Sequence, residues 1–332
     1  ALSSAASDVY KRQIYMCKIA ITMMFCMCFV MAYGQIFGQE NSIVGVVILL
    51  FLMVFKNADF GIDRKDSQLV LALVFGILLI GPKLANLTGP IVGMLINTAA
   101  IFVLVFLSCH NLLMSNHSTV VLGYLLLYGY DVSGTAFTVR IGALAVGAAL
   151  TMIVFYRGHK NRVYKRTIRD LFREIDLKSS RTRWQIALTL GIASVMAAAE
   201  ILHLPRSMWA GIAVMSVMLP FENDSKKRSD ARIPGNIIGG ILFLLLYLWL
   251  SPSFLAYAGI IGGIGVGLSA SYRWQSVFNT FGAIAVAAGL FGLPAAIFFR
   301  IAHNIFGSLY GRIFYRFFNR TIDRFCPCPT VE

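Results

Sequence analysis

Charged residues are scarce in this sequence. Asp, Glu, Lys and Arg together form 13% of the 332 residues, about half of the share found in soluble globular domains. The acidic residues are the scarcer kind, since 15 Asp and Glu stand against 29 Lys and Arg. In their place the chain carries 58% hydrophobic residues and has a mean hydropathy of +0.74. This composition excludes a soluble domain and indicates an integral membrane protein surrounded by a lipid bilayer.

Motifs of enzymes and cofactor sites are also missing. The sequence contains no Walker motif, no HExxH, no GxSxG and no paired carboxylates on one helix face, so we predict neither an enzyme nor a cofactor. Cys326 and Cys328 lack the neighbouring ligands that a metal site would need. The other cysteines lie in or near apolar segments, where they pack as small apolar residues: Cys17, Cys26, Cys28 and Cys109.

Long apolar runs separated by short polar loops fill most of the chain. In lipid, only helices satisfy the backbone without closing a barrel, so we predict an all-α protein of about twelve transmembrane helices. The first six lie at about residues 14–37, 42–55, 68–81, 88–109, 119–130 and 134–156. The second six lie at about residues 184–204, 207–221, 233–250, 254–270, 276–293 and 294–317.

The two sets of six helices resemble each other in sequence. KIAIT at 18–22 is matched by QIALT at 185–189, and VRIGALAVG at 139–147 is matched by FRIAHNIFG at 299–307. The separation stays near 160 to 167 residues, which indicates an internal duplication. Residues 1–13 resemble a translated sequencing-adaptor tail and are expected to be non-native. The remaining parts are a first six-helix repeat (14–156), a linker (157–183), a second six-helix repeat (184–318) and a cytoplasmic tail (319–332).

Lys and Arg gather in alternate loops. The odd-numbered loops contain only Lys83 and Arg206, whereas the even-numbered loops, the linker and the tail contain most of the others. Basic residues mark the cytoplasmic side, so we predict a multi-pass protein of the bacterial plasma (inner) membrane with both termini in the cytoplasm. Because six is an even number, the two repeats should be parallel and related by a pseudo-twofold axis along the membrane normal.

The linker 157–183 is rich in basic residues and divides the two halves. Apolar residues recur in it at helical spacing, which favours an amphipathic helix on the membrane surface. A solvated linker helix explains the pattern equally well. Since the basic residues lie in short segments between spans, topology accounts for the net charge of +14, and we predict no binding of nucleic acid.

Two arginines lie inside predicted spans. Arg140 and Arg300 are each about six residues into the last helix of their repeat, at equivalent positions. A buried Arg costs several kcal/mol unless it faces a polar cavity or a partner. We therefore predict that the pair faces a shared pathway across the pseudo-twofold axis and binds an anionic substrate, with His303 and Asn304 on the same face. The alternative is an arginine that snorkels or caps a helix near the outer interface.

Further candidate residues lie near the ends of spans. The second helix of each repeat is short and ends in a polar turn that contains Asn57 or Asn223, and short spans at matching places in two repeats point to a translocation site. Arg232 begins the ninth span, either as a substrate ligand or as an ordinary cytoplasmic anchor. Glu200 is the only carboxylate inside a predicted span, so it is a candidate for proton coupling or a solvated interfacial group.

Four motifs carry a resemblance to a known family. They are WAGI at 209–212, MLPF at 218–221, RxxGNxxGG at 232–240 and FFRIxxNxxG at 298–307. Together with the six-helix repeat, they make residues 14–318 similar to the fusaric acid resistance family of the aromatic acid exporter superfamily, and distantly similar to plant aluminium-activated malate transporters. The resemblance implies a plasma-membrane transporter that exports organic anions, often aromatic carboxylates.

The resemblance also implies how the chain assembles. The plant relatives resemble one half each and pair as dimers, so the duplicated chain is expected to form a pathway as a monomer or within a homodimer. Many bacterial members carry a large cytoplasmic domain and work with a periplasmic adaptor, and the short linker here argues against an adaptor. Two alternatives to a transporter stay open: a passive anion channel on the same scaffold, and a structural or lipid-handling membrane protein without a solute pathway.

Overall fold

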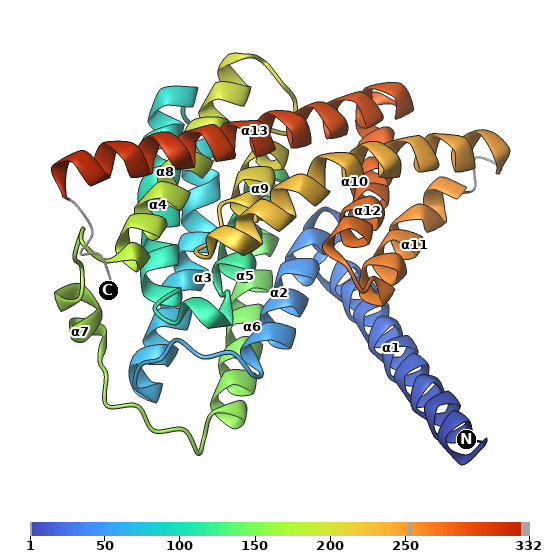
Figure 1. Cartoon of the computed structure of the whole chain (residues 1–332), viewed down its shortest axis with the longest axis horizontal. Helices are drawn as coiled ribbons and strands as arrows, with labels where there is room; N and C mark the ends of the chain where they lie inside the picture. The colour runs from blue at the N-terminus through green and yellow to red at the C-terminus, as the bar shows by residue number, and fades with distance from the viewer. Residues whose placement is uncertain (1, 251–253, 327–332) are drawn as a thin grey trace.

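Helices are the only regular structure in residues 2–250 and 254–326, which are the residues that the computed structural model describes (Figure 1). The first half contains α1 (Leu2–Phe37), α2 (Ser42–Phe55), α3 (Arg64–Asn86), α4 (Pro90–Ser108), α5 (His117–Gly129) and α6 (Gly134–Gly158), with the 3₁₀ turns η1 (Gln39–Asn41) and η2 (Leu112–Met114). The linker contains α7 (Ile168–Arg173). The second half contains α8 (Ser180–Ile201), α9 (Met208–Val217), α10 (Glu222–Trp249), α11 (Phe254–Leu268), α12 (Tyr272–Phe291) and α13 (Leu293–Phe325).

Each of the twelve predicted apolar segments corresponds to one of these helices, in the same order. A large difference is at α10, which begins at Glu222 although the predicted span begins at residue 233. The stretch 222–232 contains two Lys, two Arg, one Glu and one Ala, which are good helix formers, so the helix extends outward from the apolar part. The basic loop that the sequence predicts here is therefore the first part of α10.

The structure of the linker differs from the sequence-based prediction more than that of α10 does. Among the described residues, the one helix that lies wholly within the linker is α7, which has six residues, so an amphipathic helix along the whole linker is not formed. The preceding segment is instead held in an irregular path by the loop between α2 and α3. The backbone N–H of Asp63 donates to the carbonyl of Arg166 at 2.7 Å, and Arg64 donates to the carbonyl of Lys160 at 3.1 Å. These bonds replace the ones that a helix would make.

Six helices in the described residues are long and apolar enough to cross a membrane. They are α1 from Gln13 onward, α3, α4, α6, α8 and α10. The helices α2, α9 and α11 are apolar but shorter. With 10 residues, α9 is about 15 Å long, about half the thickness of the hydrocarbon core. The protein is therefore an all-helical membrane protein, and length and composition establish spanning character for six of the twelve predicted spans.

Helix α1 extends away from the other helices towards the N-terminus (Figure 1). Its apolar side chains are largely exposed, as expected for a helix that faces lipid: Met24, Phe25, Met31 and Ile36. Near its other end Tyr33 is buried, and its hydroxyl donates to the carbonyl of Ala143 on α6. The helix begins at Leu2 and so includes residues 2–13. That these residues derive from an adaptor stays a prediction.

Glycines bring pairs of helices into close contact. Gly307 of α13 lies against α9, because a Cβ added to it would be 2.5 Å from the carbonyl oxygen of Ala210 and 2.7 Å from the Cβ of Ala213. Gly147 of α6 lies in the same manner against Ile48 of α2. Within lipid, helices associate through van der Waals contact rather than through the hydrophobic effect. Small residues at these crossings therefore stabilise the fold.

The two halves pack their helices in corresponding pairs. The second helix contacts the sixth in both halves, as α2 with α6 and as α9 with α13. The third contacts the fifth (α3 with α5, α10 with α12), and the fourth contacts the fifth (α4 with α5, α11 with α12). Between the halves, α4 packs on α8 and α1 touches α11. The long α13 runs across the molecule in Figure 1 and contacts α8, α9, α10 and α12.

We predict that Gly307→Ala lowers the melting temperature of the purified protein. The added methyl group would meet the backbone of α9, so α9 and α13 would have to separate, and overpacking of this kind costs about 1–3 kcal/mol. Gly282→Ala in α12 is the matched control, since no atom lies within 4 Å of a Cβ at that position. Thermal unfolding of both variants in one detergent is the measurement. Equal melting temperatures would contradict the close contact of α9 with α13.

Candidate functional site

Helix α13 buries a polar face. Its buried residues recur every three or four positions and therefore lie on one side of the helix: Ala296, Arg300, His303, Asn304, Gly307, Ser308 and Gly311. The contacts of Gly307 show that this side faces α9. A buried helix face is usually apolar, because burying polar groups costs free energy unless they are hydrogen-bonded. The polar face of α13 is therefore a candidate functional site.

Arg300 is the charged residue of this face. It is 2% exposed, and its Cζ lies 5.4 Å from the ring centroid of Trp209 at the start of α9. Its Nε has no acceptor among the described residues. His303 also packs edge-on against Trp209, and its Nδ1 lies 2.7 Å from the carbonyl oxygen of Phe299, while its Nε2 has no partner there. Asn304 donates to the carbonyl of Arg300 and leaves its Oδ1 without a donor.

A second buried arginine lies towards the other end of α9. Arg232 of α10 is 4% exposed and donates from Nη1 to the hydroxyl of Tyr272 at 2.7 Å. That hydroxyl is also hydrogen-bonded to Ser216 in the last part of α9. Arg228, one turn earlier on α10, covers the Tyr272 ring with its Cζ 5.0 Å from the centroid. The Nε and Nη2 of Arg232 are buried and have no acceptor in the described part of the chain.

We call Arg228, Arg232 and Arg300 the arginine cluster. Arg300 lies beside Trp209 at the start of α9, and Arg232 is linked through the Tyr272 hydroxyl to Ser216 in the last part of the same helix. None of the three forms an ion pair with a carboxylate of the described residues. Burying an ion without a partner costs several kcal/mol. The cluster therefore has an excess of positive charge that an anion would neutralise.

Hydroxyl groups add further unused hydrogen-bonding capacity. The Oγ atoms of Ser229, Ser276 and Ser308 are buried and have no partner among the described residues. Ser229 precedes Arg232 by one turn of α10, and Ser276 follows Tyr272 by one turn of α12. Nine buried side-chain atoms in the described chain are without a partner, and eight of them belong to α10, α12 and α13. The second half thus concentrates the groups that a polar ligand could satisfy.

Arg140 occupies the equivalent place in α6, but it has partners. Its Nε donates to Oδ1 of Asn41 at 2.9 Å, and its Nη2 donates to the carbonyl of Glu40 at 3.4 Å. The Asn41 amide in turn donates to two backbone carbonyls. Arg140 therefore fastens the turn η1 to α6, which favours the capping alternative for this residue. The structure does not bring Arg140 and Arg300 together, since α6 and α13 are not among the helix pairs that pack on each other.

The other predicted site residues lie outside the arginine cluster. Asn57 follows α2 and Asn223 lies in the first turn of α10, and both are exposed. Glu200 accepts hydrogen bonds from the hydroxyls of Tyr128 and Ser207, beside a cavity of about 330 Å³ near the end of α8. The structure gathers the remaining four predicted ligands around α9: Arg232, Arg300, His303 and Asn304.

Several side chains of the site carry little signal in the sequence. Ser216 and Tyr272 have the appearance of ordinary polar residues at span ends, and Trp209 stands out only as part of a family motif. Arg228 counts as a loop residue until α10 is known to begin at Glu222. Its spacing of four residues from Arg232 is then the signal that places both on one helix face.

Residues 192–314 match a family described as fusaric acid resistance protein-like. This part of the chain belongs to that family. The match begins in α8, ends in α13 and includes the whole arginine cluster. It confirms the resemblance that the motifs between residues 209 and 307 carry. No curated protein and no solved structure matches the chain. The apolar helices and this match together indicate a transmembrane protein whose second half resembles a transport and efflux family.

Asn41→Ala should lower the melting temperature of the protein more than Asn57→Ala does. The first change leaves Nε of Arg140 buried without its acceptor, which costs about 1–3 kcal/mol, whereas Asn57 is exposed. Thermal unfolding of the two variants in one detergent measures the difference. If the two melting temperatures agree, the bond from Arg140 to Asn41 does not stabilise the protein. The prediction that Arg140 binds the transported anion would then stand.

Proposed function

We propose that the protein exports small organic anions across the membrane and that the arginine cluster binds the anion on its way. The observation that carries this proposal is the pair of buried guanidinium groups, Arg232 and Arg300, which have no carboxylate partner in the described chain. Ionised groups inside a membrane protein usually face a partner or a polar pathway. Membership of a transport family supports transport as the activity.

The short helix α9 supports the position of the site. At about half the thickness of the hydrocarbon core, it must end inside the membrane region. Transporters place such short helices at their binding sites, with the partly positive N-terminus directed at anionic groups. Trp209 at the start of α9 lies under Arg300. The helix terminus and the guanidinium group can therefore act on the same carboxylate.

Aromatic side chains support aromatic carboxylates as the substrate class. The ring of Trp209 lies beside Arg300, and the ring of Tyr272 lies beside Arg228. A planar substrate would place its carboxylate on a guanidinium fork, which matches carboxylate geometry. Its ring would then pack on these aromatic side chains in offset or edge-on contact. The combination of charge and rings fits such a molecule better than it fits an inorganic anion.

The membrane potential is sufficient to drive this export. With a negative cytoplasm, each exported negative charge gains about 2.3 kcal/mol per 100 mV. At about 1.4 kcal/mol per factor of ten, this supports a gradient of about 40-fold without any coupled ion. Proton coupling is therefore optional. If it occurs, Glu200 is the candidate carrier, through its bonds to Tyr128 and Ser207.

We further propose that the two halves are parallel repeats. The corresponding helix pairs support this arrangement, as do the equivalent places of Arg140 on α6 and Arg300 on α13. Both repeats would then begin on the cytoplasmic side of a bacterial inner membrane, and the substrate would pass between them.

Reporter fusions provide a test of this topology. Fusions at Lys160, Lys227 and Arg320 should all report the cytoplasm, because basic residues stay on that side. A fusion at Gln39 should report the outside. An external signal at Lys160 would contradict the parallel arrangement of two six-helix repeats.

Replacing either buried arginine of the site should impair export. We expect Arg232→Gln and Arg300→Gln each to reduce the efflux of radiolabelled benzoate from proteoliposomes by about tenfold, because each change removes a charged hydrogen bond of about 1.5–3 kcal/mol. Arg300→Lys should retain part of the rate, since the charge remains while the forked geometry is lost. The control is Arg320→Gln, which changes an exposed residue.

The same assay separates the alternatives. Saturable efflux that depends on the substrate supports a transporter, whereas an ohmic current with weak selectivity supports a passive channel. Arg140→Gln should reduce the melting temperature more than the efflux, because Arg140 bonds to the turn η1. Unchanged efflux in well-folded Arg232→Gln and Arg300→Gln proteins would overturn the proposed site.

A further inference from the structure

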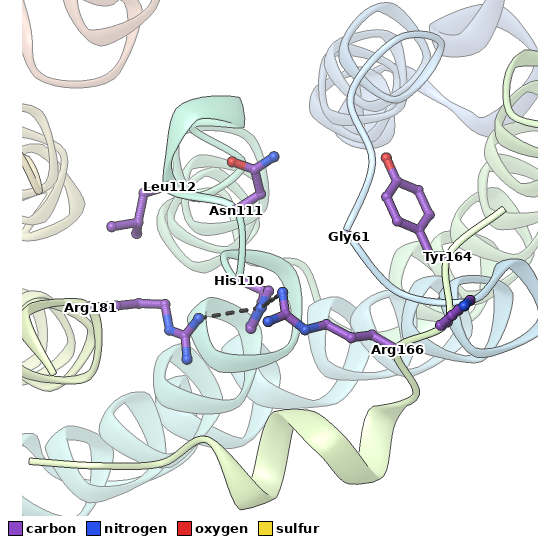
Figure 2. Close-up of a pocket in the computed structure, with 8 residues that line it drawn as sticks. Gly61, His110, Asn111, Leu112, Tyr164, Arg166 and Arg181 are labelled. Carbon is purple, nitrogen blue, oxygen red and sulfur yellow. Dashed lines mark hydrogen bonds between the residues drawn. The ribbon is translucent and has the colours of Figure 1, made fainter. Parts of the chain in front are cut away.

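The linker forms a second basic site, outside the arginine cluster. A cavity of about 640 Å³ lies where the linker meets the ends of α4 and α8. Figure 2 shows it in close-up. The lining residues that matter for its chemistry are His110, Leu112, Tyr164, Lys165, Arg166 and Arg181. They come from parts of the chain that are far apart in sequence, so the cavity exists only in the folded protein.

Two arginines approach His110 from opposite sides (Figure 2). Nη1 of Arg166 lies 2.8 Å from Nε2 of His110, and Nη1 of Arg181 lies 3.3 Å from the same atom. Guanidinium N–H groups can only donate, so in these two contacts the nitrogen accepts, and Oε2 of Glu174 lies 3.4 Å from the same nitrogen. Burial lowers the pKa of His110 and the charge of Arg181 lowers it further, while the charge of Glu174 acts in the opposite direction, so the net shift favours the neutral ring. The ring therefore holds the two guanidinium groups near each other without adding a charge.

The cavity keeps an excess of positive charge. Glu174 forms ion pairs with Arg166 at 3.1 Å and with Arg181 at 3.0 Å. Lys165 is the third cation of the cavity. After the negative charge of Glu174 is subtracted, a net charge of two positive remains. Each arginine has five donors, of which these bonds use only a part. A phosphate monoester carries about 1.5–2 negative charges near pH 7 and three acceptor oxygens, so it matches this excess.

The position of the basic residues is fixed by the fold. The Tyr164 hydroxyl donates to the buried carboxylate of Asp59 at 2.8 Å, and Arg162 pairs with the same carboxylate. The backbone carbonyl of Arg166 accepts from the N–H of Asp63. The linker is thus held against the first half by both side-chain and backbone bonds. The cavity is therefore formed before any ligand arrives, which lowers the entropic cost of binding.

The cavity lies at the level where two spans end. Both α4 and α8 are long and apolar enough to cross a membrane, and the cavity lies at the end of the first and the start of the second. Apolar side chains around α7 are exposed at the same place, among them Phe172, Ile175 and Leu177. Such residues suit contact with the lipid surface. A lipid headgroup and a soluble molecule could both reach this level.

We propose that this cavity binds the phosphate monoester group of a phosphorylated compound and thereby clamps the linker to the ends of α4 and α8. The forks of Arg166 and Arg181 suit bidentate contact with phosphate oxygens, and Lys165 adds a point charge. Leu112 and the ring of Tyr164 offer apolar surface to the rest of the ligand. The source is either a membrane lipid or a soluble organic phosphate. Binding here does not depend on the transport proposed above.

Binding to the full chain in lipid nanodiscs is the test. The lipid arm compares the melting temperature in phosphatidylcholine with that in phosphatidylcholine plus phosphatidic acid. The soluble arm titrates glycerol 3-phosphate into phosphatidylcholine nanodiscs by calorimetry. We expect binding in at least one arm, and about tenfold weaker binding for Arg166→Gln or Arg181→Gln. Arg169→Gln is the matched control, because Arg169 is an arginine of the same linker that does not line the cavity.

A second variant keeps the charges and blocks the space. Leu112→Trp should also weaken binding, because the larger side chain fills the cavity while the arginines remain. Binding in the lipid arm alone assigns a phospholipid, and binding in the soluble arm alone assigns a soluble phosphate. No binding in either arm would overturn the proposal. So would equal affinity of the Arg166→Gln and Arg169→Gln proteins at unchanged melting temperature.

Discussion

A guanidinium group keeps its charge in any protein environment, so each buried arginine needs an acceptor. Arg140 obtains its acceptors from Asn41 and Glu40 and thereby fixes the turn η1. Among the described residues Arg232 has one acceptor, the Tyr272 hydroxyl, and Arg300 lies beside the Trp209 ring. The same residue type at equivalent places is thus compensated in the first half and left in excess in the second. This difference concentrates the site in the second half of the chain.

The packing of α13 on α9 determines where the excess positive charge of the arginine cluster lies. Glycine at position 307 lets the two backbones approach closely, and the polar face of α13 then lies along the whole of the short α9. The end of α9 is fixed from outside, since Trp184 donates from Nε1 to the carbonyl of Met218 at 2.9 Å, and Ser225 bonds to the carbonyl of Val217. Gly307 and the hydrogen bonds at the end of α9 therefore determine the positions of the charged side chains.

The two basic sites are connected through the ends of α8 and α13. Arg181 in the first turn of α8 lines the linker cavity, and Arg183 beside it pairs with Asp323 near the end of α13 at 2.5 Å. Arg300 lies on the same helix, in the first part of α13. A ligand that fixes the linker would therefore act on the same helix that carries Arg300, the proposed substrate ligand. Rigid helices of this kind can transmit a shift between two sites.

Hydrophobic runs were sufficient to determine the order of twelve apolar helices, because each helix leaves a local pattern in the sequence, and the motifs between residues 209 and 307 indicated the family resemblance. The candidate residues Arg232, Arg300, His303 and Asn304 were also visible as rare polar groups within apolar helices. The tertiary structure alone decided their partners. The contact of Tyr272 with Ser216, the bond of Arg140 to Asn41 and the arginines around His110 join residues 56 to 99 positions apart. No local periodicity encodes such distances, since they depend on how whole helices cross.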